Sequence, residues 1–124
     1  MKSILFSLFL LICSVSFAQT EAQPPSTKIK AYYFHFTERC TTCKAVERVS
    51  KDALKTMSID LKSLNIDKGN NMEIAKKVGA NGQALILSNG KETINLTTDG
   101  FMYALSNPEK LISKLEAAVN QLKE

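Results

Sequence analysis

The sequence predicts an α/β domain whose elements follow in the order β-α-β-α-β-β-α. One observation is the apolar and aromatic run Ile29 to Phe36, which has the composition of a strand buried on both faces. A second is the segment after it, where apolar residues recur at helical spacing. A third is the pair Asn89-Gly90 between two apolar runs, which is typical of a β-hairpin. The chain has 124 residues, a length that suits one small domain with a single core.

The first half of the domain alternates strands with helices. After the strand Ile29 to Phe36, a helix is expected from about Cys40 to Met57, with its polar residues on the opposite side from the apolar ones. Ile59 to Ile66 has a mostly alternating pattern and predicts the second strand. Asn70 to Val78 predicts a short helix that ends at Gly79, a common stop signal. The apolar face of the first helix consists of Val46, Val49, Ala53, Leu54 and Met57.

The second half of the domain is expected to be a hairpin followed by a closing helix. Asn89-Gly90 favours a type I′ turn, because both residue types tolerate the positive φ angles that this turn requires. Asn107-Pro108 predicts a helix start, with asparagine as the N-cap and proline in the first turn. The face of that helix is lined by Leu111, Leu115, Ala118, Val119 and Leu122.

The first 18 residues are expected to be a signal peptide and no part of the fold. Lys2 gives a positive start, an apolar stretch follows, and Ser16-Phe17-Ala18 provides small residues for cleavage before Gln19. The stretch is short for a bilayer span of ~20 residues, so an uncleaved anchor is the lesser alternative. Residues 19–28 are expected to form a linker and residues 29–124 the domain. The protein is therefore expected to be exported, to the periplasm or outside the cell.

Two minor features complete this picture. Lipid attachment at Cys13 is disfavoured because bulky Ile12 stands where such sites need a small residue. The formal net charge is +4, but the lysines are interspersed with acidic residues and lack interleaved aromatics. That pattern indicates a solvated surface, and nucleic-acid binding is not expected.

After signal cleavage the only cysteines are Cys40 and Cys43, in a C-x-x-C motif. Such a pair can be a redox couple, a metal site or a structural staple. A staple closing so short a loop contributes little chain entropy. Structural zinc needs four ligands, and the only histidine, His35, could add just one to the two thiolates. Two thiolates alone suit a thiophilic ion such as arsenite or Cu(I), so a binding module remains the alternative to redox exchange.

The element order and the position of the C-x-x-C resemble the minimal thioredoxin fold, which has a central four-stranded mixed sheet. The resemblance covers nearly all of residues 29–124. More narrowly, "YYFHFTERCTTCKAVE", "NID", "GQALIL", "NG" and "FMYALSNPEK" are similar to small exported bacterial proteins called nitrophenyl compound nitroreductase subunit, ArsF family.

The resemblance implies a thiol–disulfide oxidoreductase in which Cys40 attacks a substrate disulfide and Cys43 resolves the mixed disulfide. The start of the helix is expected to lower the pKa of Cys40. Arg39 and Lys44 should add to this effect, whereas Glu38 opposes it. No bound cofactor is expected. The expected partners are protein thiols or disulfides, with a membrane redox protein as electron donor or acceptor.

Around the pair, Thr41, Thr42, Arg39 and Gln83 are the candidate substrate- or partner-binding residues. Three departures from thioredoxins accompany them. Phe34 stands six residues before Cys40, where a buried aspartate is usual, and Ser63 replaces its lysine partner. The segment Gly79 to Leu87 has no proline, so Gln83 or Ala84 takes the place of the cis-proline that faces the pair.

The ArsF family name also implies nitroreduction, which requires a flavin. A domain of this size leaves no room for a flavin pocket, and no glycine-rich dinucleotide motif follows a strand. An accessory role is therefore expected, without nitroreductase activity.

A second candidate region is "DGFMYALSNP", Asp99 to Pro108, with Phe101, Met102 and Tyr103. Side chains this large are expected to cap the sheet edge or to pack under the last helix. The alternative is that Phe101 and Tyr103 form an apolar rim for a partner beside the cysteines.

Overall fold

A four-stranded mixed sheet forms the centre of the computed structural model, which describes residues 28–124. The strands are β1 (Lys30–His35), β2 (Leu61–Asn65), β3 (Ala84–Ser88) and β4 (Thr93–Asn95), in the spatial order β2-β1-β3-β4. Strands β1 and β2 are parallel, and the two other pairings are antiparallel. The predicted mixed sheet is confirmed. The expected signal peptide (residues 1–18) and all but the last residue of the expected linker lie outside the described residues.

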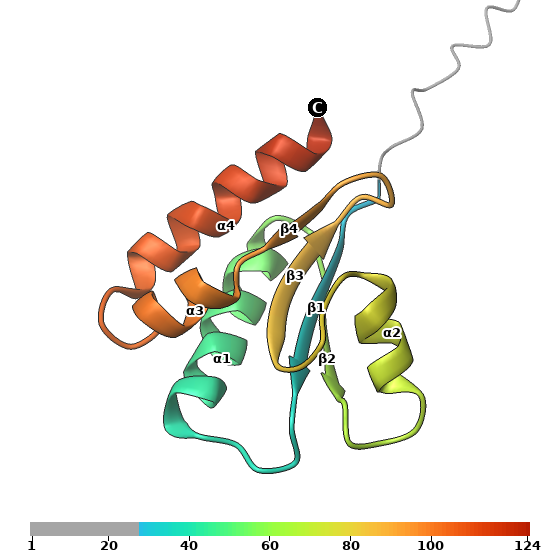
Figure 1. The fold of residues 1–124 in the computed structure, drawn as a ribbon. Helices are drawn as coiled ribbons and strands as arrows, with labels where there is room; N and C mark the ends of the chain where they lie inside the picture. The colour runs from blue at the N-terminus through green and yellow to red at the C-terminus, as the bar shows by residue number, and fades with distance from the viewer. Residues whose placement is uncertain (1–27) are drawn as a thin grey trace, which may run out of the picture.

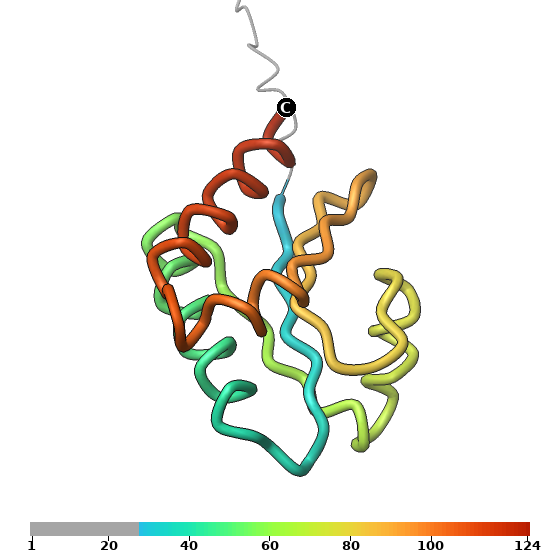
Figure 2. Tube along the Cα trace, turned by 60° about the vertical axis from the view of Figure 1, so that its left-hand side comes forward, coloured from blue at the N-terminus to red at the C-terminus, as the bar shows by residue number. Residues whose placement is uncertain are grey.

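Helices cover both faces of this sheet. Helices α1 (Thr41–Thr56), α3 (Thr97–Tyr103) and α4 (Pro108–Lys123) lie together on one face, and α2 (Asn71–Lys77) lies on the other (Figures 1 and 2). The order is the predicted one with α3 added between β4 and α4. The arrangement is thioredoxin-like. Within residues 28–124, none of the helices combines the length and hydropathy that a membrane span requires.

Strand β1 lies inside the sheet, and its alternate side chains enter two different cores. Tyr33 pairs with Leu85 of β3, and both belong to the core under α1 and α4. Tyr32 and Phe34 belong to the core under α2, together with Ile86. Each of these side chains is almost fully withdrawn from solvent. The buried strand predicted from the continuous apolar run is confirmed, and its register directs Tyr33 toward α1.

The hairpin between β3 and β4 is confirmed, but the predicted type I′ turn is wrong. A type I′ turn needs positive φ at both central residues, and only Gly90 has it, at 88°. Ser88 pairs with Thr93, so the loop is longer than two residues. The Asn89 side chain stabilises this loop by accepting the backbone N–H groups of Lys91 and Glu92 at 2.9 and 2.7 Å.

Helix α3 is the element that the sequence analysis did not predict. It crosses close to α1 at Gly100, where a Cβ atom would lie 3.0 Å from Cγ1 of Val46. Glycine therefore allows the close approach of the two helices. The next helix begins as predicted, since Asn107 caps α4 by accepting the backbone N–H of Lys110 at 3.2 Å and Pro108 occupies the first turn.

Candidate functional site

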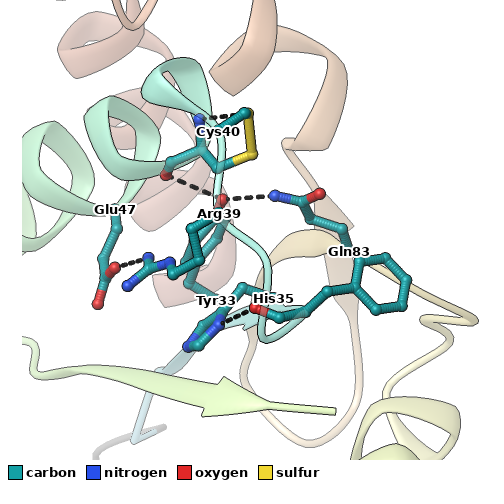
Figure 3. Close-up of polar contacts among 8 residues, drawn as sticks. Tyr33, His35, Arg39, Cys40, Glu47 and Gln83 are labelled. Carbon is teal, nitrogen blue, oxygen red and sulfur yellow. Dashed lines mark hydrogen bonds and ion pairs between the residues drawn. A yellow bond between two sulfur atoms is a disulfide. The ribbon is translucent and has the colours of Figure 1, made fainter. Parts of the chain in front are cut away.

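Cys40 and Cys43 form a disulfide at the start of α1, after the loop of residues 36–39 that follows β1 (Figure 3). Cys40 is the N-cap of the helix, and its Sγ accepts the backbone N–H of Cys43 at 3.0 Å. Cys40 is exposed, whereas Cys43 is 5% exposed. The two cysteines are therefore not equivalent: Cys40 is an exposed residue, and Cys43 is a buried one.

This placement suits a thiolate at Cys40. The first N–H groups of a helix have no partners within the helix, and their positive end stabilises negative charge nearby. The sulfur of Cys40 already occupies the position in which a capping oxygen usually stands. In the reduced protein the same N–H of Cys43 is available to a thiolate.

Beneath the pair, a tyrosine forms a buried polar link that the sequence analysis missed. The Tyr33 hydroxyl donates to the backbone carbonyl of Cys43 at 3.0 Å and accepts Nε2–H of Gln83 at 2.9 Å (Figure 3). Burial raises the pKa of the Tyr33 phenol above its ordinary value, although the hydrogen bond from Gln83 and the charge of Arg39 oppose this shift. Tyr33 is therefore a neutral hydrogen-bond donor at physiological pH.

The strand alternation explains why sequence spacing did not point to Tyr33. Phe34, at the position where the resemblance expects an aspartate, belongs to the core under α2, on the other side of the sheet. The residue facing the cysteine pair is its neighbour Tyr33. Alternate residues of a strand face opposite sides of the sheet, so the β1 residues that face α1 could have been identified from the sequence, and Tyr33 is one of them.

Arg39, expected to favour the Cys40 thiolate, forms an ion pair with Glu47 of α1 (Figure 3). Both side chains are partly buried, at 25% and 20% exposure. The carboxylate offsets much of the cationic charge close to the disulfide. Glu47 was not among the predicted site residues, because its position in the middle of a solvated helical face resembled ordinary surface charge.

A hydrogen-bond network ties the loop before Cys40 to the turn after β2. The backbone N–H of Thr37 donates to Oδ2 of Asp67 at 2.7 Å, and Asn65 Nδ2 donates to Thr37 Oγ1 at 3.1 Å. Asn65 Oδ1 in turn accepts the backbone N–H of Asp67 at 2.9 Å. The hydrogen bond from Thr37 lowers the pKa of Asp67 below its ordinary value. An ionised Asp67 thus helps to hold the chain that leads into the cysteine pair.

The other predicted residues at this end of the molecule take varied positions. Thr41 is exposed and Thr42 half-buried, both in the first turn of α1. His35 does not join the cysteines: its Nδ1–H donates to the carbonyl of Phe36 at 2.9 Å, and its ring stacks on that of Tyr33. Across residues 28–124, no three His, Cys, Asp or Glu side chains are grouped so that they could hold a metal ion.

The aromatic residues of α3 pack mainly inward. Phe101 and Tyr103 are half-buried against the core under α1 and α4. Lys110 Nζ lies 4.5 Å from the centre of the Tyr103 ring, which places that ring beside the start of α4. Met102 faces solvent with 54% exposure. These contacts agree with the packing role expected for Phe101 and Tyr103.

Comparisons of the chain with protein-family models, with curated proteins and with solved structures gave no match. The thioredoxin-like assignment therefore rests on the topology and on the disulfide at the start of α1.

Proposed function

We propose that this protein is an exported thiol–disulfide oxidoreductase that uses Cys40 and Cys43 as its redox pair. The observation that carries the proposal is the asymmetry of the pair at the start of α1. Cys40 is exposed and accepts a backbone N–H, whereas Cys43 is buried one turn further in. An accessible, electrostatically stabilised thiolate next to a protected second thiol is the arrangement that disulfide exchange requires.

In the reducing direction, the Cys40 thiolate attacks one sulfur of a substrate disulfide, and the other substrate sulfur leaves as a thiolate. Cys43 then loses its proton to solvent and attacks the Cys40 sulfur of the mixed disulfide. This step forms the Cys40–Cys43 bond and releases the second substrate thiolate. Two electrons pass from the dithiol to the substrate, and the two released thiolates take protons from water. The same steps in reverse transfer the disulfide to a partner dithiol.

The redox midpoint of the pair tests this proposal. Protein equilibrated in dithiol buffers of graded potential is quenched by alkylation, and the fraction of alkylated cysteine is measured by mass. A reversible midpoint near about −270 mV supports a reductant supplied with electrons by a partner, and one near about −120 mV supports a disulfide donor. A pair that fails to cycle would refute the enzyme and favour a binding module. A pair that cycles only after a thiophilic ion such as Cu(I) or arsenite is removed would have the same meaning.

The proposal extends to the setting of the protein. The amino-terminal sequence supports export, and protein thiols or disulfides, including a membrane redox protein, are the proposed partners. The quoted sequence motifs support a place in the ArsF group as an accessory protein without flavin. Purified protein that reduced a nitroaromatic compound with NADPH alone would contradict this accessory role.

A further inference from the structure

Tyr33, Gln83 and Cys43 form a continuous chain of hydrogen bonds from the loop before β3 to the first turn of α1 (Figure 3). Tyr33 has no solvent exposure; it belongs to the apolar core under α1 and α4, and its ring also stacks on His35 and its phenol feels the charge of Arg39. A buried hydroxyl costs ~1–3 kcal/mol unless it is hydrogen-bonded, and phenylalanine would fill the same space without that cost. The two hydrogen bonds of this hydroxyl join the backbone carbonyl of Cys43 to the side chain of Gln83.

The direction of each hydrogen bond follows from chemistry. The backbone carbonyl of Cys43 has no proton to give, so the Tyr33 hydroxyl must donate to it. The hydroxyl oxygen then accepts, and the amide of Gln83 must present its N–H. Both dipoles therefore point their positive ends toward Cys43, and each hydrogen bond polarises the next.

We propose that Tyr33 is a positioning residue that, polarised by Gln83, favours the reduced thiolate form of the Cys40–Cys43 pair. The inference rests on the proposed redox function. The carbonyl of Cys43 is a negative dipole end on the same residue as the buried sulfur, and the Tyr33 O–H partly neutralises it. Loss of this donor leaves more negative potential at the dithiol, which disfavours a thiolate and stabilises the disulfide.

Two substitutions remove the donor in different ways. Tyr33→Phe deletes the hydroxyl. Gln83→Glu keeps it but supplies a carboxylate that can only accept, so the hydroxyl turns away from Cys43. Tyr32→Phe is the matched control, because Tyr32 is the next residue of β1 and belongs to the core on the opposite face.

The equilibrium constant with a dithiol buffer and the pH profile of alkylation of the reduced protein are measured for each variant. Tyr33→Phe and Gln83→Glu are expected to shift the equilibrium toward the disulfide by about tenfold, or about 30 mV, and to move the alkylation midpoint to higher pH. Tyr32→Phe is expected to leave both values unchanged.

Each outcome has a distinct meaning. If Tyr33→Phe and Gln83→Glu lower stability but leave the potential and the alkylation profile unchanged, the hydroxyl is purely structural and the inference is wrong. If Tyr33→Phe does not fold, unchanged values in Gln83→Glu overturn the inference, and a shift there supports it only if Gln83→Leu, which removes the polarising N–H without adding a charge, moves both values in the same direction. If the unmodified protein does not cycle, the proposed function falls, and the alkylation profile of the reduced variants still tests the inference.

Discussion

Reduction of the Cys40–Cys43 disulfide should change the stability of the protein only slightly. The bond joins residues separated by 3 positions, and for so short a loop the chain-entropy model gives about 2 kcal/mol. The reduced state recovers part of this, because a Cys40 thiolate at the N-cap is stabilised by the helix by about 0.5–1 kcal/mol. The oxidised protein is therefore expected to be more stable than the reduced one by about 1–2 kcal/mol.

Urea unfolding followed by circular dichroism, with and without a phosphine reductant at neutral pH, measures this difference. The double variant Cys40→Ser/Cys43→Ser is the control, and its unfolding midpoint should not respond to the reductant. Because 30 mV corresponds to about 1.4 kcal/mol, a difference below 2 kcal/mol keeps the potential within about 45 mV of that of the unfolded dithiol. A loss of 4 kcal/mol or more would refute the reasoning, since the bond would then be a structural staple.

Three further substitutions test individual contacts within the fold, each by urea unfolding. The hydrogen bond that lowers the pKa of Asp67 stabilises the fold above the ordinary carboxylate pKa of about 3.9, and this contribution is lost as the pH falls through the lowered pKa. Asp67→Asn should therefore lose less stability than the unmodified protein between neutral pH and about pH 3. An unchanged acid response would contradict this. Ser50→Ala should raise the free energy of unfolding by about 1 kcal/mol, because the buried Ser50 hydroxyl has no hydrogen-bond partner within residues 28–124. A destabilised variant would mean that this hydroxyl is hydrogen-bonded. Gly100→Ala brings a methyl group 3.0 Å from Val46, which costs about 1–3 kcal/mol of overpacking, whereas alanine gains about 1 kcal/mol of helix propensity. The expected net loss of stability, about 0–2 kcal/mol, should disappear in a Val46→Ala background.

Much of the fold could be predicted from the sequence because the signals were local and strong. The run from Ile29 to Phe36 is apolar at every position that the two cores use, and it became β1 within one residue at each end. Asn107-Pro108 supplies both a side-chain cap and a fixed φ, so the start of α4 was predictable to the residue. The position of the cysteine pair followed from the end of this apolar run and from the helical spacing after it.

The elements that were missed depend on contacts that a sequence does not display. Helix α3 is short and contains Gly100, which reads as a helix breaker until the close contact with Val46 is known. The turn at Asn89 differs from type I′ because the side chain accepts two backbone N–H groups and so stabilises a longer loop. In both places tertiary or side-chain contacts outweighed the local propensity.

The polar surroundings of the cysteines were the hardest part of the site to predict, because they pair residues from separate segments. Tyr33 and Gln83 are 50 positions apart, and Thr37 and Asp67 are 30 positions apart. A tyrosine in a buried strand and an aspartate in a turn have ordinary structural explanations when each is considered alone. Only the folded chain brings Tyr33 to the carbonyl of Cys43 and Asp67 to the backbone N–H of Thr37.

In the proposed exchange reaction, the polar groups around the pair give the two cysteines different roles. At Cys40 the stabilising group is a backbone N–H, which belongs to the helix and survives any change of side chain. At Cys43 the neighbouring polar group is the Tyr33 hydroxyl, which donates to the backbone carbonyl, accepts from Gln83 and can be removed by substitution. Because Cys43 is 5% exposed, an external disulfide reaches Cys40 first, and Cys43 meets only the sulfur that Cys40 presents to it. In this proposal, burial sets the order of attack, and the hydrogen bonds to the backbone carbonyl of Cys43 set the balance between dithiol and disulfide.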